Sequence, residues 1–363
     1  MKILITGNMG YIGPGVVSQL RTAFPSATLI GYDMAYFASC LTNVTVLPEI
    51  KLDRQIFGDV RTMPPDVLEG IDALVYLAAI SNDPMGMRFE SVTLDVNYKS
   101  TIRIAKMAKE AGVSSFVFAS SCSIYGAAGD SAKTENDTLN PLTAYARSKV
   151  FTEKELEPLA ADDFTITSLR FATACGMSNR LRLDLVLNDF VAGAVVFGKL
   201  NILSDGSPWR PLIHINDMAR AIEWAATREA TNGGKFLAVN TGSNEGNYQV
   251  KDLAQAVTEV IPGTKVSINK DATLDKRSYR ANFNLFQSLA PNHQPVYTLH
   301  KTTQELYENL KAIDFKDNDF RNSRLIRLKV LTELQELGFI NEHLEWCHQK
   351  KKVSEQEFVL ETI

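Results

Sequence analysis

The feature that most constrains the fold is a glycine-rich turn that joins a β-rich run to a helical pattern near the start of the chain. Residues 2–6 (KILIT) carry β-branched side chains and run directly into GNMGYIG, after which residues 13–24 follow with helical spacing. Glycine lets the chain turn sharply, lets backbone approach a diphosphate, and lets the helix pack closely on the strand. The free N–H groups at the helix N-terminus favour a phosphate. Gly7, Gly10 and Gly13 therefore predict a dinucleotide-binding turn.

An acidic residue follows this turn at the spacing expected of a nucleotide-binding unit. Residues 27–33 (ATLIGYD) predict a second strand, and Asp33 ends it, 20 residues after Gly13. A carboxylate there can accept hydrogen bonds from an adenosine ribose diol and would repel a 2′-phosphate. No arginine follows directly, which favours NAD over NADP. Asp59, in GDVR, is a second acid at a position where an adenine amino group could be read.

Strand and helix patterns continue to alternate through the first half of the chain. The runs at 73–79 and 115–121 are apolar on consecutive positions, as in strands buried on both faces of a parallel sheet. Between them, residues 96–112 have helical spacing and end at Gly112, a helix-terminating glycine. The alternation predicts a doubly wound α/β sheet.

The pattern is less regular after about residue 172. Residues 208–226 predict a strand, a turn at Asn216 and Asp217, and then a helix. Residues 250–260 predict another helix, and residues 318–348 form a charged amphipathic helical stretch.

Composition excludes several classes of protein. A chain of 363 residues can bury a core without disulfides or metals, and its net charge of −4 does not favour a nucleic-acid partner. No apolar run is long enough to span a membrane, and residues 1–6 do not resemble a signal peptide. Cys40, Cys122, Cys175 and Cys347 lie far apart without a CxxC pair, which argues against disulfides and a zinc site. We therefore expect a cytoplasmic protein with no metal.

Three further motifs follow the glycine turn: YLAAISNDP at 76–84, FASSCSIYG at 118–126 and YARSK at 145–149. In this order they make the chain resemble the extended short-chain dehydrogenases/reductases, and more narrowly the nucleotide-sugar epimerases and dehydratases. The resemblance covers about residues 1–310. It implies a Rossmann domain followed by a smaller C-terminal α/β lobe that binds the substrate.

The resemblance suggests a division of the chain into two domains and a tail. We expect residues 1–171 to form the NAD-binding Rossmann domain, with some later segments returning to it. Residues 172–345 would form mainly the substrate lobe and C-terminal helices, and residues 346–363 a polar tail.

The catalytic residues of this family fall on Ser121, Tyr145 and Lys149. A sugar hydroxyl must lose a proton while its carbon is oxidised, and free tyrosine, with a pKa near 10, is a poor base at neutral pH. A lysine one helical turn away and an oxidised nicotinamide would both favour the phenolate. Ser121 would hydrogen-bond the same sugar hydroxyl and orient it.

The resemblance also implies the residues that contact each ligand. The expected cofactor contacts are Gly7, Gly10, Tyr11, Ile12, Gly13, Asp33, Asp59, Val60, Leu77, Ala78, Ala79, Asn97, Tyr145 and Lys149. The substrate would be a nucleotide-diphosphate sugar, and Arg210, in SDGSPWRPLIHINDMARA, falls on the arginine that binds its diphosphate, a task that suits the bidentate guanidinium. The other substrate candidates are Ser81, Asn82, Ser121, Cys122, Ser123, Tyr145, Asn188 and Arg277.

Two departures from the family pattern bear on the reaction. The 4,6-dehydratases carry an Asp-Glu pair directly after the catalytic serine or threonine, whereas this chain has Cys122 and Ser123. Removal of water from a sugar needs a general acid and base, so the sequence disfavours dehydration. In the segment 170–178 (RFATACGMS), Thr173 and Cys175 replace the usual Asn and Tyr of RxxNxYGP, which changes the expected sugar pocket.

We therefore predict an NAD-dependent epimerase of a nucleotide-diphosphate sugar, acting at C4 through a transient 4-keto intermediate. The alternatives are a nucleotide-sugar 4-ketoreductase or oxidoreductase, a dehydratase, and, in another class, a non-catalytic Rossmann protein that senses the cofactor. Intact Ser121, Tyr145 and Lys149 argue against the sensor. Related enzymes commonly dimerise through four helices, and apolar stripes in 97–111 and 143–158 predict such a homodimer here.

Overall fold

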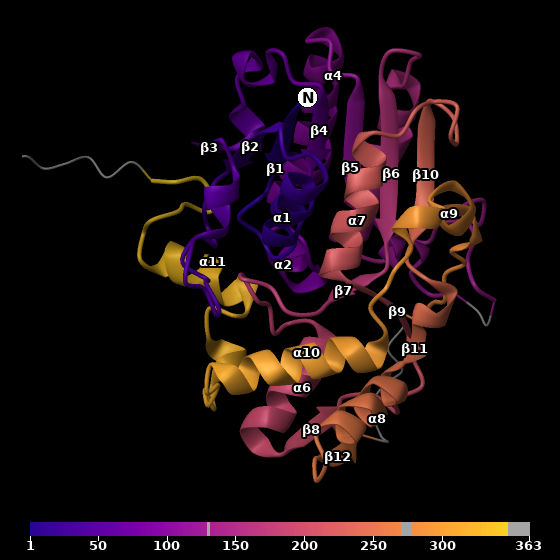
Figure 1. Ribbon diagram of the computed structural model, residues 1–363. Helices are drawn as coiled ribbons and strands as arrows, with labels where there is room; N and C mark the ends of the chain where they lie inside the picture. The colour runs from indigo at the N-terminus through magenta and orange to yellow at the C-terminus, as the bar shows by residue number, and fades with distance from the viewer. Residues whose placement is uncertain (129–130, 270–277, 348–363) are drawn as a thin grey trace, which may run out of the picture.

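The structure, a computed structural model, describes residues 1–128, 131–269 and 278–347. A seven-stranded parallel sheet lies at its centre, in the order β10-β6-β5-β4-β1-β2-β3 (Figure 1). Its strands are β1 (Lys2–Thr6), β2 (Thr28–Asp33), β3 (Arg54–Phe57), β4 (Ala73–Tyr76), β5 (Ser115–Ser121), β6 (Thr165–Phe171) and β10 (Phe236–Thr241). The predicted doubly wound α/β sheet is confirmed.

Helices cover both faces of this sheet, and each face has its own apolar core. Ile3 and Ile5 of β1 pack on one face, with residues of α1 (Gly13–Ala23) and α7 (Ile215–Ala226). Leu4, which points the opposite way because side chains alternate along a strand, packs on the other face with residues of α4 (Ser100–Glu110). The helices on this second face are α2 (Asp83–Arg88), α3 (Glu90–Leu94), the π-helical turn η4 (Asp95–Lys99), α4 and α5 (Ala144–Leu156).

The second half of the chain builds a smaller lobe below the carboxyl ends of these strands (Figure 1). It contains a three-stranded sheet of β11 (Asn247–Gln249), β9 (Trp209–His214) and β7 (Thr173–Cys175), and a two-stranded sheet of β12 (Lys265–Ile268) and β8 (Lys199–Ile202). Its helices are α6 (Val186–Phe197), α8 (Val250–Val260) and α10 (Leu299–Ala312), while α9 (Asn284–Leu289) packs by β10. Strand β10 and helix α7 return to the Rossmann sheet although they follow lobe segments in the sequence.

Two local predictions were wrong. The expected turn at Asn216 and Asp217 is the first turn of α7, because the side chain of His214 caps the helix: its Nδ1 accepts a hydrogen bond from the Asn216 N–H at 3.1 Å. The expected helix over 318–348 is limited to α11 (Arg327–Glu336). The chain then passes through Gly338, whose φ is +71°, and folds back on itself.

Further findings concern the cysteines, membrane-spanning helices, metal sites and the C-terminal segment. The four cysteines are free thiols, and Cys347 is the exposed one. Within the described ranges, no helix is long and apolar enough to cross a bilayer, and no cluster of side chains is suited to a metal ion. Trp346, assigned by sequence to a polar tail, packs its ring 5.5 Å from that of Tyr36. Residues 348–363 lie outside the described part of the chain.

Candidate active site

A cavity opens at the carboxyl ends of β1, β2 and β4, where an open α/β sheet usually binds its ligand. Eleven of the residues predicted to contact the cofactor line this cavity: Gly7, Gly10, Tyr11, Ile12, Gly13, Asp33, Asp59, Val60, Leu77, Ala78 and Ala79. We refer to it as the dinucleotide pocket.

The glycine turn at the base of this pocket has the close packing that a dinucleotide-binding turn needs. Gly7 has a φ of +74°, and a Cβ there would lie 2.6 Å from the backbone nitrogen of Ala78. A Cβ on Gly13 would lie 1.9 Å from the carbonyl oxygen of Asn8. Both positions therefore exclude a side chain, and the open N-terminus of α1 faces the pocket. The residues present fit an NAD molecule.

Both predicted acids reach the pocket, but their carboxylates already have partners. Asp33 accepts hydrogen bonds from the backbone N–H groups of Met9 at 3.0 Å and Ala35 at 2.7 Å, while its burial raises its pKa. Asp59 pairs with Arg61, whose Nη2 lies 2.6 Å from the carboxylate. Each carboxylate oxygen can accept more than one hydrogen bond, so Asp33 retains the capacity to bind a ribose diol.

The first prediction concerns cofactor choice. Cofactor-stripped protein should bind NAD roughly ten- to a hundredfold more tightly than NADP in calorimetry, because Asp33 would repel a 2′-phosphate and lose its hydrogen bonds to the diol. In Asp33→Ser this preference should shrink. Equal affinity of the wild-type protein for the two cofactors would contradict the prediction.

The three predicted catalytic residues lie together beside this pocket. Helix α5 begins after Thr143, whose hydroxyl caps it by accepting a hydrogen bond from the N–H of Ala146 at 3.1 Å. Tyr145 therefore lies in the first turn and Lys149 one turn later. The phenol of Tyr145 lies near Ser121 at the end of β5, and the Ser121 side chain acts to lower the pKa of this phenol. The Lys149 ammonium lies 5.5 Å from the centroid of the Tyr145 ring and donates a hydrogen bond to the Ala119 carbonyl at 2.6 Å.

Burial shifts the pKa values of Tyr145 and Lys149 in the directions that favour the neutral form of each side chain. It raises the pKa of Tyr145 to about 12, although the Ser121 side chain partly opposes this shift. The same effect lowers the pKa of Lys149 to about 7, partly opposed by the negative charge of Glu153. In the cofactor-free protein, Lys149 alone therefore does not bring the pKa of Tyr145 below its usual value. A bound cation such as oxidised nicotinamide would have to contribute.

The second prediction follows from the pKa of Lys149. Between pH 7 and 10.5 the folded protein binds fewer protons at this lysine than the unfolded chain, so its contribution to stability falls as the pH falls. Lys149→Met removes this penalty. The melting temperature of the cofactor-free variant, relative to wild type, should be higher at pH 6 than at pH 10 by roughly 2–5 °C.

Lys154→Met provides the control, because Lys154 is exposed on the same helix. Its melting temperature relative to wild type should not depend on pH in this range. If the Lys149 variant behaved like this control, Lys149 would not carry a lowered pKa.

Asn97, predicted to contact the cofactor, forms hydrogen bonds that join two segments of the site. Its side chain is fully buried, accepts a hydrogen bond from the Ile80 N–H at 2.8 Å and donates to the Ile80 carbonyl at 3.0 Å. A third bond, 3.2 Å long, reaches the hydroxyl of Ser148 on α5. Asn97 lies in the π-helical turn η4, a distortion common at functional sites. It connects the loop after β4 to the helix that carries Tyr145 and Lys149.

The predicted substrate residues Ser81 and Asn82 belong to one polar cluster. The amide of Asn82 donates to Asp184 at 2.7 Å, and Asp184 also pairs with Arg182. Arg182 donates in turn to the hydroxyl of Ser81 at 3.1 Å. Arg182 lines the dinucleotide pocket, and its charge helps to lower the pKa of Tyr145. Sequence reasoning missed this arginine, because only the fold brings it near Tyr145.

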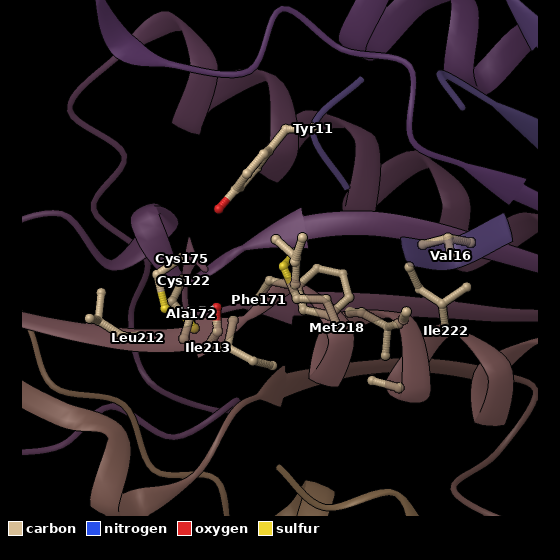
Figure 2. Close-up of a cluster of buried hydrophobic side chains, with 14 of the residues drawn as sticks. Tyr11, Val16, Cys122, Phe171, Ala172, Cys175, Leu212, Ile213, Met218 and Ile222 are labelled. Carbon is tan, nitrogen blue, oxygen red and sulfur yellow. Dashed lines mark hydrogen bonds between the residues drawn. The ribbon is translucent and has the colours of Figure 1, made fainter. Parts of the chain in front are cut away.

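Cys122 and Ser123, which follow Ser121, have different surroundings. Cys122 is fully buried among apolar side chains such as Phe171 and Ala172 (Figure 2), and its thiol donates to the Arg170 carbonyl at 3.0 Å. Burial raises its pKa. The side chain of Cys122, predicted to contact substrate, therefore belongs to the core in this structure. The Ser123 hydroxyl, in contrast, has no hydrogen-bond partner among the described residues.

The remaining substrate candidates lie in the second half. Arg210 is half-buried on β9, and its charge acts on the buried phenol of Tyr279. Asn188 is fully buried. Its amide forms hydrogen bonds with Tyr11, Gly176 and Arg182, and these bonds stabilise the wall of the dinucleotide pocket. Arg277 lies outside the described residues.

Curated proteins are similar to this chain over more than half of its length. The chain is 26% identical over 276 residues to a UDP-glucose 4-epimerase from Corynebacterium glutamicum, covering 72% of this chain and 80% of that protein. It is 29% identical over 234 residues to an uncharacterized UDP-glucose epimerase, YtcB, from Bacillus subtilis, covering 61% of this chain and 71% of that protein.

Solved structures share the fold. MoeE5 in complex with UDP-glucose and NAD matches with a TM-score of 0.73 and 25% identity, over 86% of this chain and 99% of that chain. The UDP-glucuronic acid 4-epimerase of Bacillus cereus matches with a TM-score of 0.72 and 20% identity, over 86% of this chain and all of that chain (100%). A family model matches residues 3–242, and the chain belongs to the NAD dependent epimerase/dehydratase family.

Proposed function

We propose that this chain is an NAD-dependent epimerase that inverts C4 of a nucleotide-diphosphate sugar. The observation that carries the proposal is the grouping of Ser121, which acts on the pKa of Tyr145, with Tyr145 and with Lys149 one turn away, beside a pocket built on a glycine turn. This arrangement provides a base at the place where a sugar hydroxyl would meet a nicotinamide.

The residues of the chain would divide the work as follows. NAD, when bound, supplies the reversible oxidation that the sugar carbon requires. Tyr145 accepts the proton of the hydroxyl on that carbon and returns it at the end, while Ser121 orients the same hydroxyl. The positive charge of Arg182 favours the phenolate, bound oxidised nicotinamide and protonated Lys149 would add to this effect, and Arg210 would hold the diphosphate while the sugar turns over to present its other face.

The surroundings of Ser121 favour epimerisation over dehydration. Elimination of water needs an acid and a base close to the carbon chain of the sugar, and the position after Ser121 holds a thiol whose pKa burial raises. The next position holds the hydroxyl of Ser123, which suits a hydrogen bond to a sugar but not proton abstraction. Neither side chain provides the acid–base pair of a dehydratase.

A panel of nucleotide sugars tests the proposal. Purified protein without added cofactor would be incubated with UDP-glucose, UDP-galactose, UDP-N-acetylglucosamine and UDP-glucuronic acid, since relatives carry UDP-sugar names. The expected result, followed by NMR of the anomeric proton, is interconversion of a C4 epimer pair with no net NADH. Accumulation of a 4-keto-6-deoxy sugar would indicate a dehydratase, and stoichiometric NADH an oxidoreductase; either would refute the proposal.

We also propose that the enzyme forms a homodimer through α4 and α5. Phe151 of α5 is 41% exposed, and its ring lies 5.7 Å from that of Tyr98, so the two rings form an apolar contact on the outside of these helices. Light scattering at micromolar concentration should give twice the monomer mass, and Phe151→Glu should give a monomer. A monomeric wild-type protein would refute the dimer.

A further inference from the structure

The C-terminal segment forms part of the wall of the dinucleotide pocket, which no family motif in the sequence predicts. Arg327, the first residue of α11, and Leu344, after that helix, both line the pocket together with Tyr36 and Phe37. Figure 1 shows α11 close to the carboxyl ends of β1 and β2, far along the chain from the glycine turn.

Several hydrogen bonds hold this segment against the adenosine end of the pocket. The guanidinium of Arg61 donates to the carbonyl of His343 at 2.6 Å and to that of Leu344 at 3.2 Å, and the Tyr36 hydroxyl also donates to Leu344. The indole N–H of Trp346 donates to the carbonyl of Met34 at 2.8 Å. The segment is therefore fixed to the residues that follow Asp33 and Asp59.

Arg327 is the charged group that this segment brings to the pocket. Its side chain is 1% exposed, and its guanidinium lies 4.9 Å from the centroid of the Phe37 ring. Two backbone carbonyls accept its hydrogen bonds, that of Arg180 at 2.6 Å and that of Arg324 at 3.2 Å. These bonds leave three of the five guanidinium N–H groups for other acceptors.

Within the described part of the chain, the charge of Arg327 has no carboxylate partner, unlike that of the two arginines nearby. Arg180 pairs with Glu49 at 2.7 Å, and Arg182 pairs with Asp184 at 2.9 Å. Among the residues that the structure describes, no carboxylate lies within ion-pair distance of Arg327. A buried cation without an anion is costly, and the pKa of Arg327 is lowered to about 10, mainly by burial. An anionic ligand would offset this cost.

The position of Arg327 indicates which part of the cofactor would supply the anion. On one side it stacks on Phe37, close to the acid expected to bind the adenosine ribose. On the other side it bonds the carbonyl of Arg180, whose own N–H bonds Ser178 at 3.0 Å. The Ser178 hydroxyl donates in turn to the carbonyl of Tyr11, in the glycine turn, at 2.6 Å. Arg327 thus lies between the adenosine end and the glycine turn, where a dinucleotide carries its diphosphate.

We propose that Arg327 is a cofactor-binding residue that holds the NAD diphosphate from the side opposite the glycine turn. The C-terminal segment 327–347 is then an integral part of the cofactor site. The diphosphate would lie between the partial positive charge at the N-terminus of α1 and this guanidinium. The inference depends on NAD as the cofactor and does not depend on which nucleotide sugar is the substrate.

Binding measurements on cofactor-stripped, full-length Arg327→Met test the proposal. A charge-assisted hydrogen bond is worth about 1.5–3 kcal/mol, so the affinities for NAD and ADP-ribose should fall roughly ten- to a hundredfold in calorimetry. The affinity for adenosine, measured by ligand-detected NMR, should change less than about threefold. Arg327→Lys should recover part of the lost affinity for ADP-ribose.

The melting temperature distinguishes a ligand contact from a structural role. Without ligand, Arg327→Met should melt at or above the wild-type temperature, because it removes an uncompensated buried charge. Arg324→Met serves as the matched control, since this neighbouring arginine is exposed and pairs with Glu333, and it should leave all three affinities unchanged. Equal losses for adenosine and ADP-ribose, or a lower melting temperature without ligand, would overturn the proposal, as would unchanged affinity for ADP-ribose.

Discussion

Tyr145→Phe should reduce turnover by roughly 10² to 10⁴-fold, the range typical of general acid–base catalysis, while leaving NAD affinity and stability close to wild type. Phenylalanine keeps the ring that packs near Lys149 and removes only the hydroxyl whose pKa Ser121 helps to lower. In the proposed mechanism, Tyr145 is the group among the described residues that accepts the proton of the sugar hydroxyl.

The dependence on pH gives this prediction a second readout. Burial holds the pKa of Tyr145 near 12 without ligand, so the phenolate is the minor form at neutral pH. Wild-type kcat/KM should therefore rise with pH until the phenolate predominates, and bound oxidised cofactor should bring this rise to lower pH because its charge favours the phenolate. The residual activity of Tyr145→Phe should lack the rise.

Tyr76→Phe is the matched control for the loss of a phenol. Tyr76 is buried in the Rossmann core, where its hydroxyl donates to the Val96 carbonyl at 3.2 Å rather than to Ser121 or Lys149. Its substitution should affect stability by about 0.5–1.5 kcal/mol and turnover very little. If Tyr145→Phe were as active as Tyr76→Phe, the tyrosine of YARSK would not be the base.

The parts of the site that the sequence predicts are those set by neighbouring residues. Gly7 and Gly13 act through a turn of a few residues, and Asp33 ends the adjacent strand, so local spacing places all three at the pocket. Tyr145 and Lys149 are four residues apart, and helix geometry alone puts them on one face. These positions could be assigned from the sequence because the parallel strands end at one edge of the sheet, which brings the residues that follow them together.

The residues that sequence reasoning missed depend on contacts between distant segments. Arg182 reaches Ser81 across 101 residues, and Arg327 bonds Arg180 across 147. Nothing near either arginine in the sequence distinguishes it from a surface charge. Cys122 was considered for the substrate site because it follows Ser121, but it begins the 3-10 turn after β5, and its thiol donates to the Arg170 carbonyl inside the core. Adjacency in the chain did not imply access to the pocket.

Gly13→Ala should have the second large effect, a loss of NAD affinity of roughly a hundredfold or more together with a lower melting temperature. The added methyl group would lie 1.9 Å from the Asn8 carbonyl oxygen, and 2.4 and 2.7 Å from the carbonyl and α carbons of the same residue. These are backbone atoms, so the turn itself must move. Such overpacking typically costs about 1–3 kcal/mol, and the shift would disturb the N–H groups that face the diphosphate.

Alanine substitutions at other glycines of the same region test whether the loss of NAD affinity comes from this clash or from a general intolerance of alanine. A Cβ on Gly10 would lie 3.2 Å from the Gly7 carbonyl oxygen, and one on Gly15 would lie 3.3 Å from a side-chain oxygen of Asn216, which can move. Gly15→Ala lies within α1, where alanine is favoured over glycine by about 1 kcal/mol. NAD affinity, measured by calorimetry on stripped protein, should therefore fall least for Gly15→Ala, more for Gly10→Ala and most for Gly13→Ala.

If Gly13→Ala is too unstable to purify, a comparison of Gly10→Ala with Gly15→Ala still tests the predicted order of affinities. Equal affinities across the series would mean that the turn does not approach the diphosphate, and the cofactor site would have to be sought elsewhere in the fold.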